Sequence, residues 1–336
     1  YSDRTVTSIF IGGGTPSLLS GEQIGQLMDR IREQFAMAQD AEITMEVNPG
    51  TASAEKLRNF YTAGINRLSI GMQSAQAEEL KNLGRIHDFE GFCQVYREAV
   101  EAGFTNINVD IMSGLPGQTL ASYRDTLEKV LHLEPMPQHI SAYSLIVEEG
   151  TPFAAMAERG ELPLPEEETE RAMYEETIEV LAKYGFHRYE ISNYARDGYE
   201  CRHNVGYWIR RDYLGFGIGA ASLIDNVRFQ NEKSLGAYLA HPLESREEEQ
   251  TLTVQDRMEE TMFLGLRLTR GVSCVDFAEQ YGRTVEEVYG EVIARNVADG
   301  LLTVTERKEN QKKDRFLALT KRGLDLSNYV MAQFLF

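Results

Sequence analysis

The stretch Thr7-Ser8-Ile9-Phe10-Ile11-Gly12-Gly13-Gly14-Thr15-Pro16 decides the fold of this chain. A short apolar run ends in three glycines, and Glu22–Phe35 then shows the apolar spacing of a helix. The same order of apolar run, turn and helix recurs along the first two thirds of the chain. The further expected strands are Glu42–Val47, Arg67–Ile70, Asn106–Met112, His139–Leu145 and Arg188–Ile191. Repeated strand–helix units predict a parallel sheet, either open or closed into a barrel.

Glycines and polar residues gather where these strands end, and the carboxyl ends of parallel strands share one edge of a sheet. Glycines 12–14 let a ligand approach the backbone closely, and the helix that follows adds N–H donors. Glu46 and Asp110 could accept hydrogen bonds at this edge, and Arg85 could hold a carboxylate by two parallel bonds. Ordinary turn glycines, a salt bridge at Glu46 and a surface position for Arg85 are the structural alternatives.

Four runs carry a resemblance to a known family. Gly13-Gly14-Thr15-Pro16, Glu46-Val47-Asn48-Pro49, Arg67–Gln73 and Asp110–Gln118 stand in the order and spacing of the radical-SAM enzymes similar to oxygen-independent coproporphyrinogen III oxidase. The resemblance runs from Thr7 nearly to the C-terminus and implies an α/β fold, a partial (β/α)₆ radical-SAM barrel. It also implies S-adenosylmethionine (SAM) and a [4Fe–4S] cluster as cofactors.

The resemblance further implies which residues contact SAM. It assigns Gly13 and Glu46 to one SAM molecule. It assigns a second SAM molecule to Gly14, Thr15, Gln73, Arg85 and Asp110. Whether this chain binds one SAM or two is open at this point.

A second run separates two branches of that family. Cys201-Arg202-His203-Asn204-Val205-Gly206-Tyr207-Trp208 is similar to the haem-chaperone branch more than to the oxidase. A histidine can ligate haem iron, and aromatic rings can stack on a porphyrin face. A hydrogen-bonded core histidine beside two buried aromatic residues is the structural alternative. We therefore expect a haem-binding and haem-transfer chaperone, with haem or porphyrin as ligand at His203 and a haem-acceptor protein as partner. The alternative function is the oxidase, which decarboxylates two propionates.

The cysteines depart from the family pattern. The family holds its cluster with Cys-x-x-x-Cys-x-x-Cys, whereas Cys93, Cys201 and Cys274 are far apart here. Because that motif follows the first barrel strand in the family, we expect the strand and the cluster cysteines upstream of Tyr1. The chain as written is expected to bind no cluster and to perform no radical chemistry.

A smaller region follows the barrel. The acidic segment Leu243–Gln250 suggests a solvated link, and the expected domains are residues 1–242 and 243–336. In the second, three helices precede a hairpin, which is typical of a winged-helix-like domain. Its helix Val285–Asp299 carries several acidic residues, the opposite of what DNA recognition requires.

Composition excludes several further classes. The chain has 336 residues, 42% of them apolar and 26% charged, with a formal net charge of −18. A surface this negative repels nucleic acids and anionic membranes. No apolar stretch is long enough to span a bilayer, and no signal peptide opens the chain. Three dispersed cysteines argue against a disulfide framework and fit a cytoplasmic protein.

Overall fold

The computed structural model describes residues 4–242, 244, 246–309 and 312–335. The chain forms two compact units, Tyr1–His203 and Asn204–Phe336, and each is described by itself. This division concerns packing within the chain. The domain boundary that the sequence predicts at 242/243 remains a prediction.

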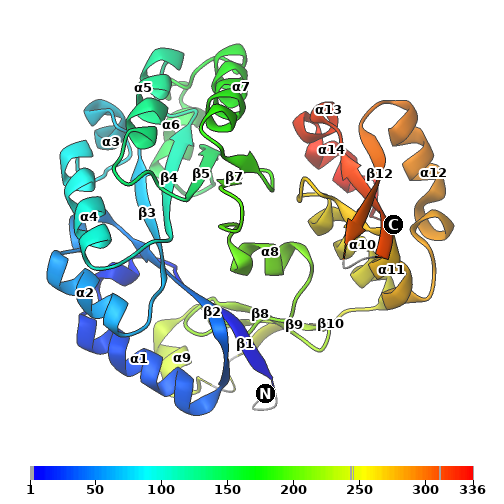
Figure 1. Ribbon diagram of the computed structural model, residues 1–336, viewed down its shortest axis with the longest axis horizontal. Helices are drawn as coiled ribbons and strands as arrows, with labels where there is room; N and C mark the ends of the chain where they lie inside the picture. Colours follow the sequence, from blue (N-terminus) through cyan, green and yellow to red (C-terminus); the bar gives the residue numbers. More distant parts are fainter. Residues whose placement is uncertain (1–3, 243, 245, 310–311, 336) are drawn as a thin grey trace. The chain divides into compact units, whose positions relative to one another are not determined.

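The first unit is built on a curled seven-stranded sheet, a half-barrel, which confirms the fold class expected from the sequence (Figure 1). Its first five strands are parallel neighbours in chain order. They are β1 (Thr5–Ile11), β2 (Ala36–Val47), β3 (Arg67–Gln73), β4 (Ile107–Ser113) and β5 (His139–Ser144). Figure 1 shows the helices of this unit along the outer, convex side of the sheet.

Helices alternate with these strands, as the apolar spacing predicts. They are α1 (Gly21–Gln34), α2 (Ala54–Thr62), α3 (Ala77–Asn82), α4 (Phe89–Glu101), α5 (Leu120–Leu131), α6 (Pro152–Glu158) and α7 (Glu167–Lys183). The core of the unit lies between helices and sheet, where Met28 of α1 and Phe60 of α2 pack in one cluster with Met45, Ile70 and Val109 of the strands. All five side chains are fully buried. Each such side chain contributes about 1.5–3 kcal/mol when it leaves water.

The end of the sheet differs from the sequence-based expectation. The strand expected at Arg188–Ile191 is wrong, because β6 (His187–Arg188) and β7 (Asn193–Ala195) form two very short strands there. β7 pairs antiparallel with both β5 and β6, so the sheet is not parallel throughout. Strands of two or three residues have too little alternation to be located from sequence.

The second unit begins within α8 (Arg202–Trp208), a helix that straddles the division. A three-stranded sheet follows, made of β8 (Ala221–Ile224), β9 (Val227–Asn231) and β10 (Arg246–Thr251), with α9 (Leu235–Ala240) between the last two strands. β10 contradicts the expected solvated link, since its backbone pairs antiparallel with β9. Its acidic side chains stay largely exposed, which is why the segment resembles a linker in sequence.

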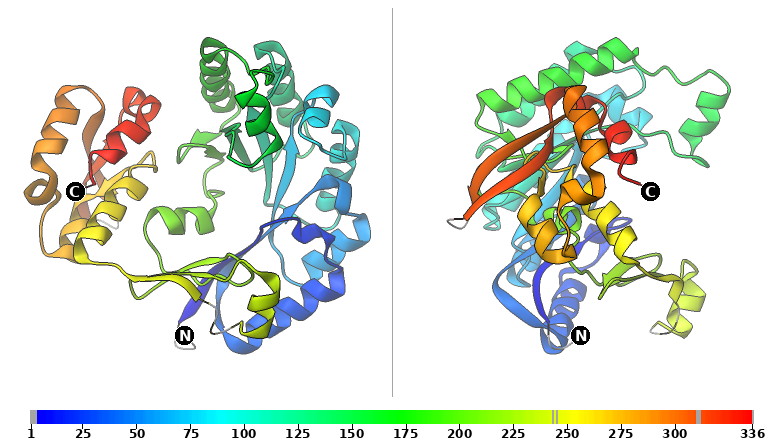
Figure 2. Two further views of the ribbon diagram at one scale, coloured as in Figure 1. Left: turned by 180° about the vertical axis from the view of Figure 1, so that it is seen from behind. Right: turned by 90° about the vertical axis from the view of Figure 1, so that its right-hand side faces the viewer.

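The C-terminal part has the expected winged-helix-like order of helices and hairpin (Figure 2). Its helices are α10 (Val254–Gly265), α11 (Cys274–Tyr281), α12 (Val285–Ala298), α13 (Lys321–Asp325) and α14 (Ser327–Ala332). Its strands are β11 (Val272–Ser273), β12 (Leu302–Glu309) and β13 (Lys312–Leu319), and β13 lies between the other two. The helical segment after the hairpin is divided into α13 and α14 at Leu326, whose backbone is not helical. Among the helices of the described residues, none is both long and apolar enough to cross a membrane.

Candidate functional site

The concave face of the half-barrel is polar, in contrast to the convex face that the helices cover. Successive residues of a strand point to opposite faces, so every second side chain shares a face. We define the concave face by the alternate residues Ser8 of β1, Glu42, Thr44 and Glu46 of β2, Arg67, Ser69 and Gln73 of β3, Asn108 and Asp110 of β4, and His139, Ser141 and Tyr143 of β5. A polar face enclosed by strands is expected to bind ligands rather than to stabilise the fold.

A hydrogen-bond network crosses three strands of this face. The Asn108 side-chain amide donates to Ser69 Oγ and to Asp110 Oδ1, each at 2.7 Å. Asn108 Oδ1 therefore faces His139 Nδ1, at 2.6 Å, and must accept a hydrogen bond from its N–H group. His139 Nε2 is then the acceptor for the Tyr189 hydroxyl at 2.9 Å. Burial, and secondarily the charge of Arg67, hold the pKa of His139 well below its usual value, so the imidazole is neutral.

The loop after β1 meets β2 at the carboxyl edge of the sheet. The Gly13 backbone N–H donates to Glu46 Oε2 over 3.2 Å. Gly13 has a φ of +80° and Gly14 a φ of +65°, which residues with a side chain rarely adopt. The Glu46 pKa is raised, chiefly by burial and also by the Asp110 carboxylate, while the Gly13 bond lowers it. The carboxyl edge of the sheet thus brings the carboxyl groups of Glu46 and Asp110 into partly buried surroundings.

Gln73 ends β3 in a conformation that is uncommon for its residue type. Its φ is +68°, in the left-handed region, and the β3–β4 register shifts between Gly71 and Gln73. The Tyr143 hydroxyl donates to Gln73 Oε1 at 3.0 Å. Backbone strain of this kind costs about 1–3 kcal/mol and is concentrated at ligand sites.

The pKa of Tyr143 depends on the charges of several other predicted residues. Burial raises the pKa of the Tyr143 phenol, and Asp110 and Glu46 raise it further, whereas Gln73 and Arg85 lower it. Among the described contacts, Gln73 is hydrogen-bonded to Tyr143 and Gly13 to Glu46, whereas Glu46, Arg85 and Asp110 reach Tyr143 only through their charge. Gly14 and Thr15 follow in the same loop, and their contact with a ligand remains a prediction.

Asp110 is a partly buried member of the predicted set, whereas Gln73 is buried. Burial raises its pKa, while hydrogen bonds from Asn108, Ser141 and Ser69, and the charge of Arg67, act in the opposite direction. Sequence reasoning found Asp110 but missed the polar side chains that surround it. The available signal was a polar residue at every second position of an otherwise apolar strand.

His203 also belongs to the first unit and lies against the start of the sheet. Ser8 Oγ is 3.0 Å from His203 Nδ1, and the Phe10 ring lies 5.2 Å from the imidazole, centroid to centroid. The buried Glu42 carboxylate accepts from the backbone N–H groups of Arg202, at 2.9 Å, and His203, at 3.0 Å. Burial lowers the His203 pKa, and Arg67 lowers it further, against the opposing charge of Glu42.

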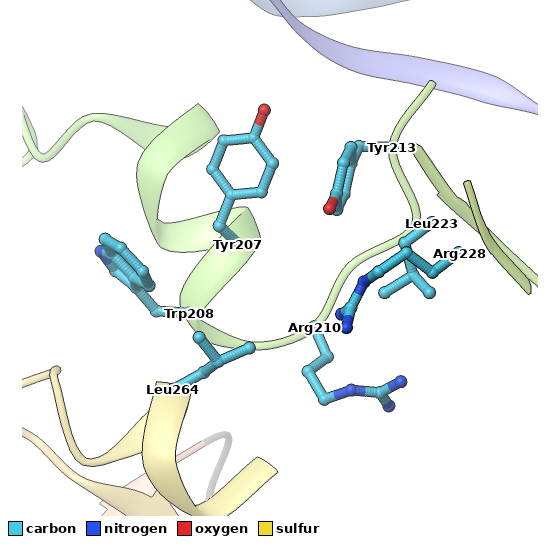
Figure 3. Close-up of a pocket in the computed structure, with 7 residues that line it drawn as sticks. All are labelled: Tyr207, Trp208, Arg210, Tyr213, Leu223, Arg228 and Leu264. Carbon is cyan, nitrogen blue, oxygen red and sulfur yellow. The ribbon is translucent and has the colours of Figure 1, made fainter. Parts of the chain in front are cut away.

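The two aromatic residues of the same run line a cavity inside the second unit (Figure 3). The cavity measures about 240 Å³. Its lining is Tyr207, Trp208, Arg210, Tyr213, Leu223, Arg228 and Leu264. The Tyr207 and Tyr213 rings meet edge to face at 4.7 Å, and Arg210 and Arg228 each bind Glu260 at 2.8 Å.

Comparisons with known proteins agree with this architecture. The radical SAM superfamily model matches residues 1–130, and the HemN C-terminal domain model matches residues 252–326. Coproporphyrinogen III oxidase (HemN) from Escherichia coli superimposes with a TM-score of 0.81 at 25% sequence identity, over 98% of this chain and 78% of that one.

Curated relatives extend over nearly the whole chain. The heme chaperone HemW of Bacillus subtilis is 39% identical over 335 residues, covering 98% of this chain and 85% of the relative. HemW of Lactococcus lactis is 36% identical over 336 residues, with coverage of 100% and 86%. HemW of Escherichia coli is 37% identical over 308 residues, with coverage of 89% and 78%. This chain therefore belongs to the HemW haem-chaperone family within the radical-SAM superfamily.

Proposed function

We propose that this protein binds haem and passes it to an acceptor protein, and that the carboxyl edge of its half-barrel binds SAM. The observation that carries the proposal is His203, held by Ser8 and Glu42 at the head of a run that also contains Tyr207 and Trp208. The family assignment supports the same function, since its curated members are heme chaperones.

His203 has the chemistry of a haem ligand. Its Nδ1 lies 3.0 Å from Ser8 Oγ, and a hydrogen bond on one ring nitrogen is the usual support of an imidazole that binds a metal through the other. Burial lowers the His203 pKa, which keeps the ring in the neutral form that metals require. The alternative, a purely structural histidine, would use the same Ser8 contact without any iron.

The cavity at Tyr207 and Trp208 supports contact with a porphyrin edge. At about 240 Å³ it is smaller than the about 300–1,000 Å³ of pockets that enclose a drug-sized ligand. It could therefore receive one edge of a tetrapyrrole but not the whole macrocycle. The aromatic faces suit a flat ring, whereas the Arg210 and Arg228 guanidinium groups of the lining already pair with Glu260.

Replacement of His203 tests the proposal. We expect His203→Ala to weaken haem binding by at least about tenfold, followed at the Soret band, because an axial ligand is lost. His132→Ala is the matched control, since His132 is exposed at the C-cap of α5, where its ring bonds the Glu128 carbonyl oxygen. Unchanged haem affinity in His203→Ala, together with a lower melting temperature, would instead identify a structural histidine.

The carboxyl edge fits SAM. Glu46 and Asp110 concentrate negative charge in partly buried surroundings, and SAM carries a sulfonium and an ammonium cation. Gly13 presents backbone to a ligand at close range, Gln73 adds an amide, and Arg85 could hold the SAM carboxylate. We propose these five residues, with Gly14 and Thr15, as the SAM contacts. Calorimetric titration would give the number of SAM molecules bound.

The cysteines do not fit a [4Fe–4S] cluster. Cys93 lies in α4, Cys201 is buried against Glu42, and Cys274 begins α11. A cubane cluster requires several thiolates close together, and the described residues contain no group of three or more metal-ligating side chains placed to hold an ion. We assign no cluster to these residues and derive no step from one.

Coproporphyrinogen oxidation is the second candidate function, favoured by the superposition with HemN at a TM-score of 0.81. Anaerobic incubation of the intact, cluster-loaded protein with coproporphyrinogen, SAM and a reductant separates the two candidates. Release of two carbon dioxide molecules per porphyrinogen would support the oxidase, and haem transfer without decarboxylation would support the chaperone.

A further inference from the structure

Arg67 is a buried cation on the concave face without an acidic partner. Its side chain begins β3 and is 2% exposed. Among the described residues, no hydrogen bond or ion pair to its guanidinium is found, and Nε is fully enclosed without an acceptor. Burying an unpaired charge costs several kcal/mol, so the stability of the fold does not explain this residue.

Thr44 is a second unsatisfied group directly beside it. Thr44 and Arg67 are opposite each other in the β2–β3 pairing, so their side chains lie next to each other on the same face. Thr44 is fully buried, and its Oγ1 likewise finds no hydrogen-bond partner in the part of the chain that the structure describes. Buried polar groups are nearly always paired, and two neighbouring exceptions indicate that an external group completes them.

The nearby carboxylates of this face are already engaged. Asp110 accepts from Asn108 and Ser69, and Glu42 accepts from the backbone of Arg202 and His203. The charge of Arg67 reaches Asp110 and His203 nonetheless, since it lowers the pKa of both. Arg67 thus lies within electrostatic reach of both the proposed SAM edge and the proposed haem ligand.

We propose that Arg67 and Thr44 form a carboxylate-binding subsite on the concave face. A planar guanidinium beside a hydroxyl donor offers up to three hydrogen bonds to the two oxygens of a carboxylate. The subsite rests on the proposed function for its ligand, because that function brings two carboxylates to this unit, a tetrapyrrole propionate and, where Arg85 does not hold it, the α-carboxylate of SAM. The shared chemistry is the carboxylate, and the experiment distinguishes the two sources.

The test compares Arg67→Met, which keeps an unbranched apolar side chain and removes the charge, with Arg67→Lys, which keeps the charge. Arg124→Met is the matched control, because Arg124 is exposed and pairs with Glu176 on the convex side. Each variant is titrated with haem, haem dimethyl ester, SAM and decarboxylated SAM. We expect Arg67→Met to lose about ten- to hundredfold in affinity for one carboxylate ligand and nothing for its carboxylate-free analogue. Arg67→Lys retains part of the affinity.

Thermal melts complete the test. Arg67→Met should melt no lower than the parent protein, because it removes an unpaired buried charge. Propionate alone should raise the melting temperature of the parent but not of Arg67→Met. Equal affinities of parent and Arg67→Met for all four ligands would overturn the subsite and leave buried water as the partner of Arg67. A lower melting temperature for Arg67→Met would overturn it as well, in favour of a structural role.

The melts with propionate alone test the subsite independently of haem and SAM. If the parent binds neither haem nor SAM, the proposed function fails, and a propionate shift that Arg67→Met abolishes still supports the subsite. If haem and SAM bind equally to parent and Arg67→Met, the proposed function stands and the subsite falls.

Discussion

The two faces of the seven-stranded sheet differ in the polarity of their side chains. On the convex face, Leu68, Ile70 and Val109 are fully buried in the apolar core. On the concave face, the residues between them are polar: Arg67 and Ser69 alternate with Leu68 and Ile70 along the same strand. The convex face stabilises the fold, whereas the concave face contains an unpaired cation and a strained glutamine, each of which costs stability. We proposed above that ligand binding, rather than folding, accounts for the second set.

Two neighbouring substitutions in β3, one on each face of the sheet, should differ strongly in their effect on the free energy of unfolding, and this is the largest effect that we expect. Ile70→Ala should lower the free energy of unfolding by about 2–5 kcal/mol, because it leaves a cavity in the core. Ser69→Ala, one residue away on the concave face, should cost only about 1 kcal/mol for the lost hydrogen bonds to Asp110 and Asn108. Urea unfolding of both variants measures the difference. Equal losses would mean that the concave face contributes to stability as the convex face does.

Glu46→Gln tests whether a carboxylate of the concave face binds SAM rather than stabilises the fold. We expect SAM affinity to fall about tenfold or more, since a charged acceptor of the SAM cations is lost. The folded-state pKa of Glu46 is raised, so its ionised form destabilises the fold at neutral pH, and removal of the charge should leave stability unchanged or increased.

Calorimetric titration and thermal melts measure both quantities, with Glu55→Gln on the exposed side of α2 as control. If Glu46→Gln melts well below the parent and binds SAM normally, the carboxylate serves the fold, and the proposed SAM edge loses its central residue.

The free energy of unfolding should also change with pH, by less than it changes in Ile70→Ala. Burial lowers the pKa of His87, His139 and His203, so the unfolded chain binds more protons than the folded one below about pH 6.5. Stability is therefore fully present above the unfolded pKa and is lost as pH falls from about 6.5 toward the lowered folded values. Each unit of pKa shift corresponds to about 1.4 kcal/mol.

Unfolding free energies at pH 7.5 and 5.5 measure this loss. His139→Asn removes one titrating group and should reduce the difference between the two pH values. The raised pKa values of Glu46 and Asp110 act in the opposite sense, since stability falls as pH rises through their window. They are common to parent and variant, so they cancel in the comparison. An unchanged difference in His139→Asn would show that His139 accepts a proton in the folded state.

Local sequence predicted the architecture of the first unit and much of the carboxyl edge. The repeated order of apolar run, turn and helix is a local signal, and it predicted a parallel sheet, open or closed into a barrel. Glu46, Gln73 and Asp110 lie at or near strand ends, and parallel strands end at one edge, so their proximity followed from chain order. The His203–Trp208 run indicated the family branch that the HemW relatives confirm.

Only the tertiary structure decided which distant residues meet. His203 meets Ser8 across 195 positions of sequence, and Arg67 lies beside Thr44 because of the β2–β3 register. Alternation determines the face on which a side chain lies, but strand register and neighbour choice depend on the packing of the whole sheet. That Arg67 forms no direct ion pair within the described part of the chain is likewise invisible in sequence, because a partner can come from any strand. The polar periodicity was thus determined locally, and the unpaired cation within it was decided by the fold.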